Sequence, residues 1–263
     1  MSIFNKLILS IAGGKEHPPM TPVRSRTSIK RSPRVHILPL HNVSFTKTGD
    51  EKTIKLSNLS VTGTGFFRNS HHDWPDTDGV IDGSFSFKGK KYPISMTIIH
   101  HSPMIIGCAV DEPNRQVMRS FVSRYFDLEL SALQLYEVDP KYLKDEKTGT
   151  PRWFQGKDNC EVYIIEQDNK IILFNITFFG NHIEGGDTVP LRYGLIVDDD
   201  EAETDTIFRM KGATVIRPID IFSPELIESA LKFVSNLEVL TGKQRTTILE
   251  KLKAQRKHLE TTL

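Results

Sequence analysis

The chain has 263 residues and a formal net charge of +1, and 38% of its residues are hydrophobic while 25% are charged. This composition is typical of a globular protein and excludes a chain that is disordered or fibrous throughout. The length suffices for one large domain or two small ones, and we favour two. No apolar run reaches the roughly 18 residues that a membrane-spanning helix needs.

Charge is distributed unevenly along the chain. Residues 1–36 contain seven Lys or Arg and one acidic residue, Glu16, whereas six acidic residues crowd into the segment 198–205. A basic segment of this kind favours an anionic, phosphate-bearing ligand, and the acidic segment is typical of a solvated loop. Residues 13–34 are rich in Gly, Pro, Ser and basic side chains, so we predict that they are mobile, and we assign residues 1–23 to a flexible basic N-terminal arm that precedes the first domain.

Alternating apolar residues after this arm predict antiparallel strands. Phe85 and Phe87 alternate with polar residues, Gly89 supplies a turn, and the alternation resumes over residues 92–98. A period of two with aromatic and β-branched residues indicates a sheet with one buried face. The run 104–110 is apolar on both faces, as expected for a central strand.

A helical pattern follows these strands. It opens at Pro113 and places Val117, Phe121 and Val122 on one side. Strands in series that are closed by a helix predict a small antiparallel β-barrel followed by a helix, which we assign to residues 24–130.

A second group of strands is predicted in the next part of the chain. Residues 131–151 are turn-rich and are expected to form a linker. Apolar runs separated by hairpin-type turn sequences, together with a fourth strand at 206–216, predict a second β-sheet domain over residues 152–218. The first three runs are 160–166, 171–179 and 189–197.

The C-terminal region is predicted to be helical. Ser223 offers an N-cap hydroxyl, and Pro224 is suited to the first helical position. Apolar residues from Ile227 to Leu240 recur at helical spacing, and we expect them to pack on the second sheet. Beyond Gly242 the pattern becomes polar, which leaves self-association or a partner helix open. Residues 219–263 thus form a long C-terminal helical region in a fold that is mainly β (α+β).

Asn58, Ser60 and Gly63 form the pattern Asn-x-Ser-x-x-Gly at the end of a predicted strand. Strand residues two apart share a face, and Gly permits a tight turn, so two short polar side chains can meet a nucleotide base edge. Any transition from strand to turn can show this pattern by itself. Its specificity comes from the basic element upstream.

That element contains Lys30, Arg31 and Arg34. Arginine offers a planar fork that suits both phosphate and the O6 and N7 acceptors of guanine. A basic element followed by this motif resembles the PilZ domain family, whose signature is R-x-x-x-R and then [DN]-x-S-x-x-G. The resemblance covers about residues 24–127, including the apolar strand at 106–110, and we recognise no family in the remainder.

The resemblance implies a receptor for cyclic di-GMP, a bacterial second messenger, which the arm would hold against the barrel face. It assigns no catalytic residue, metal or cofactor. The implied ligand-binding residues are Lys30, Arg31, Arg34, Asn58, Ser60 and Gly63, with Arg26 as an additional candidate.

Lys30 stands where the family has its first arginine. Lysine keeps the charge and loses the planar guanidinium, so whether this position still supports binding stays open. The leading prediction is a non-enzymatic cytoplasmic receptor that relays occupancy to an unidentified protein partner. The alternative is an interaction scaffold that no longer binds nucleotide and assembles through its C-terminal helix. Nucleic-acid binding is disfavoured, because surface aromatics are not interleaved with the basic residues.

Other reactive side chains have structural interpretations. Cys108 and Cys160 lie in apolar runs and are predicted to be reduced core residues. The histidine pairs at 71–72 and 100–101 lack further ligands at suitable spacing, so no metal site is predicted. Cys160 and the distant His182 are only weak candidates for a catalytic nucleophile and its general base. The chain carries no phosphate-binding loop or dinucleotide fingerprint.

Overall fold

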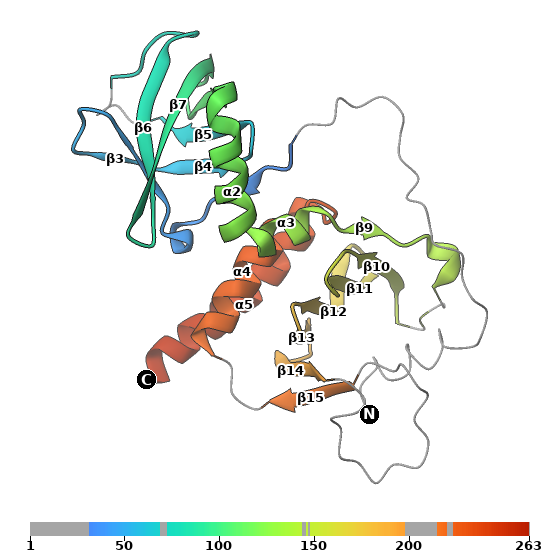
Figure 1. Cartoon of the computed structure of the whole chain (residues 1–263). Helices are drawn as coiled ribbons and strands as arrows, with labels where there is room; N and C mark the ends of the chain where they lie inside the picture. Colours follow the sequence, from blue (N-terminus) through green and yellow to red (C-terminus); the bar gives the residue numbers. More distant parts are fainter. Residues whose placement is uncertain are drawn as a thin grey trace. The chain divides into compact units, whose positions relative to one another are not determined.

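The computed structural model describes residues 32–68, 73–143, 146, 148–197, 215–219 and 223–262 (Figure 1). Within them the chain is mostly β and contains two antiparallel sheets, of eight and seven strands. The chain separates into two compact units. The eight-stranded unit comprises Ile29–Gln134 and Glu228–Thr241, and the seven-stranded unit is built on Leu135–Ile227 and Gly242–Leu263.

The eight-stranded sheet has the strand order β1-β4-β5-β8-β7-β6-β2-β3. The turn predicted at Gly89 is confirmed, because β6 and β7 pair as a hairpin around Lys88 and Gly89. The strands are β1 (Val35–His36), β2 (Ser44–Lys47), β3 (Thr53–Ile54), β4 (Leu56–Leu59), β5 (Gly63–Phe67), β6 (Val80–Phe87), β7 (Lys90–His101) and β8 (Ile105–Val110).

This sheet is a half-barrel, so the small antiparallel β-barrel in the predicted fold class is wrong. Its edge strands β1 and β3 do not pair with each other. Each of them is two residues long and pairs on one side only, with β4 and β2 respectively. Alternation reveals strands and their buried faces, whereas closure depends on pairing between edges that are distant in sequence.

Aromatic side chains fill the space between the inner face of this sheet and helix α2 (Arg115–Tyr125). Phe45, Phe66 and Phe85 come from the sheet and Phe121 from the helix, and all are at most 2% exposed. Ring centroids within this set lie 5.0 to 5.9 Å apart. Burying one Phe contributes about 1.5–3 kcal/mol, so the cluster firmly fixes which face of the sheet is turned inward.

Of the three residues predicted on one side of α2, Phe121 and Val122 are buried as expected. Met118 is buried where Val117 was expected, and Val117 is 39% exposed. A 3₁₀ turn, η2 (Glu112–Asn114), directly precedes this helix. The unit also contains η1 (Pro39–His41) and α3 (Asp127–Leu133).

The seven-stranded sheet is a meander in which each strand pairs with its neighbour in sequence, in the order β15-β14-β13-β12-β11-β10-β9. Its first strands lie partly within the segment 131–151, which also holds η3 (Pro140–Tyr142). The strands are β9 (Tyr136–Glu137), β10 (Thr150–Gln155), β11 (Glu161–Gln167), β12 (Lys170–Phe178), β13 (Asn181–Gly186), β14 (Arg192–Val197) and β15 (Val215–Ile219).

Strand β13 was missed by the sequence analysis, because its Gly185 and Gly186 resemble a turn. Both glycines are buried in the sheet. A β-carbon at Gly186 would overlap the carbonyl oxygen of Ile172 on the paired strand, so glycine is required here for close strand approach. The predicted strand at 206–216 lies mainly outside the described residues, and β15 begins at Val215.

The C-terminal region forms two helices, α4 (Pro224–Ser235) and α5 (Gly242–Thr262). The predicted cap of α4 is confirmed, since the Leu226 N–H donates to the Ser223 hydroxyl at 3.1 Å. The predicted fold class has one long C-terminal helical region, and this is wrong because the two helices belong mostly to different units. Most of α4 groups with the eight-stranded unit, and α5 lies against β12 in the seven-stranded unit.

Helix α5 uses its one apolar stripe within its own unit. Ile248 and Leu252 are fully buried, and the side chain of Gln244 donates to Glu166 at 2.7 Å. Among the described helices, none combines the length and apolar character needed to cross a membrane. Both cysteines are buried and free, as predicted, and burial raises the pKa of the Cys108 thiol to about 12.

Candidate functional site

The predicted motif lies where β4 ends and β5 begins. The Ser60 hydroxyl donates to the Gly63 carbonyl oxygen at 3.0 Å and accepts from the Gly63 N–H at 3.0 Å. The Ser60 N–H donates to the same carbonyl oxygen at 2.8 Å, and the side chain is 1% exposed. The hydroxyl is therefore engaged within the turn, and Ser60 shapes the backbone instead of facing a ligand.

Gly63 is also a structural residue of this turn. A β-carbon at this position would lie 2.7 Å from the carbonyl oxygen of Cys108 on the paired strand β8. That distance is too short for any residue with a side chain unless the backbone moves. Ser60 and Gly63 together set how β5 enters the sheet, and so they position the residues on either side of them.

Asn58 is the motif residue whose side chain reaches solvent. It pairs with His36 of β1 on one side and with Gly65 of β5 on the other. Its amide lies over Gly65, because a β-carbon there would be 2.6 Å from Nδ2 and 3.1 Å from Oδ1. Within the described part of the chain, this amide has no hydrogen-bond partner.

The same row continues across two more strands. Gly65 pairs with Gly107 of β8, and Gly107 pairs with His100 of β7. A β-carbon at Gly107 would overlap the Cε1 and Nδ1 atoms of the exposed His100 imidazole. We call the set His36, Asn58, Gly65, Gly107 and His100 the glycine row. It has two glycines as its floor and polar side chains on both flanks.

Two β-bulges turn the flanking side chains outward. One lies between Leu56 and Asn58, and the other lies between Ile98 and His100. Leu56 and Ile98 are buried, so regular alternation would send the residues two further along into the core as well. Each bulge inserts one residue, which places Asn58 and His100 on the outer face. The sequence pattern cannot reveal this, because a bulge is defined by the register of the paired strand.

Of the predicted basic residues, the structure describes Arg34. It is exposed and directly precedes β1, where Val35 is buried and His36 is exposed. Arg34 and His36 thus flank an inward-facing residue and lie on the solvent side. Arg26, Lys30 and Arg31, together with the arm at 1–23, lie outside the described residues.

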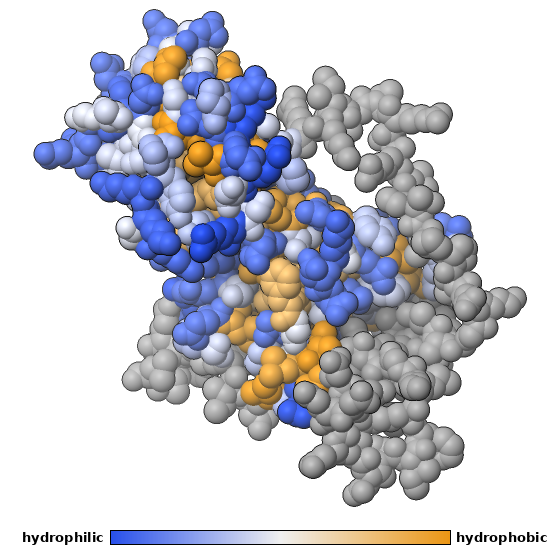
Figure 2. Space-filling model, in the orientation of Figure 1, coloured by the Kyte–Doolittle hydropathy of each residue, from blue (hydrophilic) through white to orange (hydrophobic). Residues whose placement is uncertain are grey.

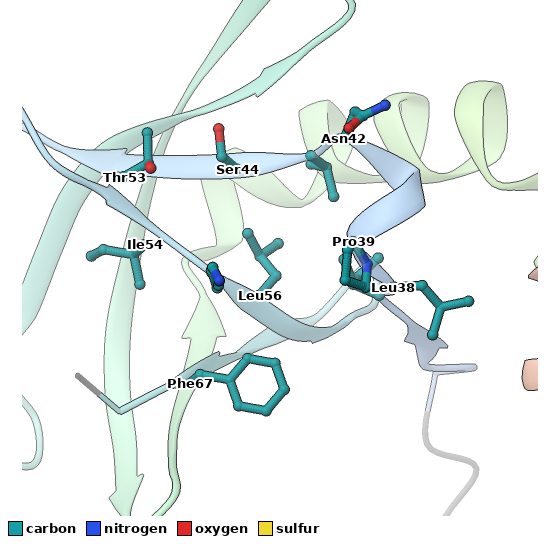
Figure 3. A pocket seen from close by; sticks show the side chains of 11 residues that line it. Leu38, Pro39, Asn42, Ser44, Thr53, Ile54, Leu56 and Phe67 are labelled. Atoms are coloured by element: carbon teal, nitrogen blue, oxygen red, sulfur yellow. The ribbon is translucent and has the colours of Figure 1, made fainter.

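A cavity of about 400 Å³ opens beside the glycine row in the same unit (Figure 3). Phe67, two residues beyond Gly65 on β5, lies at this cavity and is 43% exposed. Most of the lining is apolar, and Lys55 adds an ammonium group. The lining residues are Ile37, Leu38, Pro39, Asn42, Val43, Ser44, Thr53, Ile54, Lys55, Leu56 and Phe67. Figure 2 shows that hydrophilic side chains dominate the visible face of this unit, with smaller apolar patches among them.

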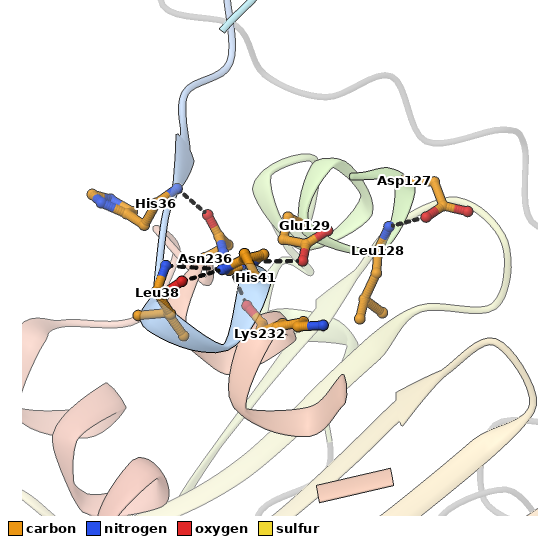
Figure 4. A network of polar contacts seen from close by, with 8 residues as sticks. All are labelled: His36, Leu38, His41, Asp127, Leu128, Glu129, Lys232 and Asn236. Carbon is orange, nitrogen blue, oxygen red and sulfur yellow. Dashed lines mark hydrogen bonds and ion pairs between the residues drawn. The ribbon is translucent and has the colours of Figure 1, made fainter. Parts of the chain in front are cut away.

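Hydrogen bonds connect strand β1 to the end of helix α4 (Figure 4). The His36 N–H donates to Asn236 Oδ1 on the chain just after α4 at 2.8 Å, and Asn236 Nδ2 donates to the Lys232 carbonyl oxygen at 2.9 Å. Asn236 is fully buried. The short strand that carries His36 is therefore coupled by hydrogen bonds to the C-terminal end of α4.

A buried pair anchors the chain that follows β1. His41 Nδ1 accepts from the Leu38 N–H at 2.8 Å, so the ring proton lies on Nε2, which donates to Glu129 of α3 at 2.8 Å. Both side chains are 3% exposed. This pair ties η1 to α3 and limits how far β1 can move (Figure 4).

The seven-stranded sheet also has a polar face, formed by Asn175, Thr177, His182 and Glu184, all at most 9% exposed. His182 Nδ1 lies 3.2 Å from Thr177 Oγ1, and burial lowers the pKa of His182 to about 4. Among the described residues, no group of three or more His, Cys, Asp and Glu is arranged to hold a metal ion. His71 and His72, considered for that role, lie outside this part of the chain.

Comparison with solved structures gives weak likeness, and comparison with family models and curated proteins gives none. A crystal structure of an uncharacterized Legionella protein is similar with a TM-score of 0.30 at 16% identity, over 36% of this chain and 94% of that one.

Proposed function

We propose that this protein is a non-enzymatic cytoplasmic receptor for cyclic di-GMP. The ligand binds on the glycine row. The observation that carries this proposal is the Asn58 amide, which is turned outward by a β-bulge, lies over a glycine floor and has no hydrogen-bond partner among the described residues. The family resemblance of the Asn58-x-Ser60-x-x-Gly63 motif names the ligand.

The chemistry of the row suits a guanine base. An amide side chain offers two donors and an acceptor, so Asn58 can pair with two adjacent groups on a base edge. Gly65 and Gly107 carry no side chains of their own, so the Asn58 amide and the His100 ring can lie close against the sheet there. Ser60 and Gly63 keep this surface in shape through the turn that they form.

Arg34 suits the phosphates of the same ligand. Its guanidinium is exposed and lies next to β1, whose His36 belongs to the row. A guanidinium binds phosphate through two parallel hydrogen bonds. Lys30 and Arg31 extend the positive charge along the preceding sequence and attract a ligand that carries two negative charges.

A relay to a protein partner is supported by the contact between β1 and Asn236. A ligand that draws Arg34 and His36 toward the row acts on a strand whose His36 N–H is bonded to Asn236. Helix α4 begins in one compact unit and ends in the other, since Ile227 and Glu228 belong to different units. The apolar stripe of α5 is used within its own unit, so nucleotide binding is better supported than assembly through that helix.

Isothermal titration with cyclic di-GMP tests the proposal. We expect Asn58→Ala and Arg34→Ala each to weaken binding by about tenfold or more, because each loses hydrogen bonds worth about 1.5–3 kcal/mol. The matched controls are Asn114→Ala and Arg119→Ala, which remove the same groups from other positions of the unit. A folded wild-type chain that binds no cyclic di-GMP, or controls that lose as much affinity as the row variants, would contradict the proposal.

A further inference from the structure

His100 has a conformation that a strand histidine with a purely structural role does not require. The β-bulge after Ile98 turns its ring to the outer face, and the ring edge is directed at Gly107. The imidazole is exposed, and within the described residues it has no hydrogen-bond partner. One aromatic face is therefore available for stacking next to the floor of the row.

The side chains of His100 and Asn58 lie over neighbouring glycines of the row. They flank Gly107 and Gly65, which pair directly across neighbouring strands, and such strands lie about 4.8 Å apart. A purine stacked on the imidazole therefore reaches the Asn58 amide with its polar edge. Histidine belongs to the aromatic side chains that stack on unpaired bases.

We propose that His100 determines the specificity of the site for purines by stacking on one guanine while Asn58 binds the edge of that base. This inference rests on the proposed function and adds a residue that lies 42 positions after Asn58 in the sequence. It also explains why position 107 is glycine, because any β-carbon there would overlap the ring.

Two variants separate the stacking face from other roles of the side chain. His100→Ala removes the ring, whereas His100→Phe keeps an aromatic face and loses the ring nitrogens. Base stacking on an aromatic side chain is worth about 1–3 kcal/mol, so we expect His100→Ala to weaken cyclic di-GMP binding about tenfold. His100→Phe should stay within about threefold of the wild type. Ile99→Ala, at the exposed neighbouring position, is the matched control and should bind like the wild type.

A pyrimidine dinucleotide sharpens this test. The preference of the wild type for cyclic di-GMP over cyclic di-UMP should shrink several-fold in His100→Ala and persist in His100→Phe, because a purine offers more stacking area. Melting temperatures measured alongside show whether each variant is folded. Equal cyclic di-GMP affinity in wild type and His100→Ala, or equal losses in the Ala and Phe variants, overturns the role of His100 alone. A folded wild type that does not bind cyclic di-GMP overturns this role together with the proposed function.

Discussion

Each of the two sheets carries a row of polar side chains, and the two rows differ in access to solvent. In the seven-stranded sheet, Asn175, Thr177 and His182 are at most 5% exposed. In the eight-stranded sheet, Asn58 is half-buried, and His100 is exposed beside two glycines. Polar strand residues are thus buried within the unit in one sheet and form an open surface in the other.

Burial also shifts pKa values in the seven-stranded sheet. Burial lowers the pKa of His182 to about 4, so the imidazole is neutral near neutral pH, and burial also raises the pKa of Glu161 on strand β11 of the same sheet. A buried neutral group contributes to the fold and is withheld from solutes. The polar groups of the glycine row remain free to exchange water for a ligand, which is why we place the binding site there.

Replacing one glycine of each sheet by alanine gives the largest expected difference in stability. Gly186→Ala would overlap the backbone of Ile172 and should lower the free energy of unfolding by about 3 kcal/mol, in the upper range for overpacking. Gly65→Ala meets only the movable Asn58 amide, so its cost should stay below about 1 kcal/mol. Urea unfolding of both variants measures this. Similar losses in the two variants would remove the distinction between the two glycine environments.

Lowering the pH should weaken the seven-stranded unit through His182. The unfolded side chain takes up a proton below about pH 6.5, whereas the folded one resists protonation until about pH 4. Stability from this group is therefore present above pH 6.5 and declines as the pH falls toward 4, by up to about 3 kcal/mol. His182→Gln should lack this component of the pH dependence.

The two tryptophans let each unit be followed separately. Trp153 belongs to the seven-stranded unit and Trp74 packs against the core of the eight-stranded unit, so Trp74→Phe leaves a reporter for the former. Unfolding of Trp74→Phe, with and without His182→Gln, should diverge as the pH falls from 6.5 to 4. Parallel pH profiles for the two chains would show that His182 is not buried in its neutral form.

Removing the Ser60 hydroxyl tests whether this residue stabilises the turn or contacts the ligand. Ser60→Ala loses two hydrogen bonds within the turn, which should cost about 1–2 kcal/mol of stability. At a temperature where the variant is folded, its affinity for cyclic di-GMP should fall less than that of Asn58→Ala. A larger loss of affinity in Ser60→Ala, at full folding by circular dichroism, would give the hydroxyl a direct part in binding.

Much of this architecture is readable from sequence, in particular where signals are local. The hairpin at Gly89, the Ser223 cap and the buried cysteines follow from turn chemistry, capping and apolar runs. The open edges of the half-barrel and the separation of α4 from α5 depend on distant pairings and on which surface each helix meets. Strand β13 was hidden because glycines needed for close packing look like turn residues.

The site was predictable only in part for the same reason. Asn58 was named from its motif and lies on an open face, whereas Ser60 and Gly63 turn out to be engaged in the backbone turn. Gly107 and His100 were not predicted as site residues, because only the strand register and a bulge bring them beside Asn58.

Cyclic di-GMP titrated into the wild-type chain and into Asn58→Ala, with Asn114→Ala as control, tests the central claim most directly. We predict saturable binding to the wild type and the control, and a loss of about tenfold or more in Asn58→Ala. Absence of binding by a folded wild type, or equal affinity in all three chains, would contradict a nucleotide site on the glycine row.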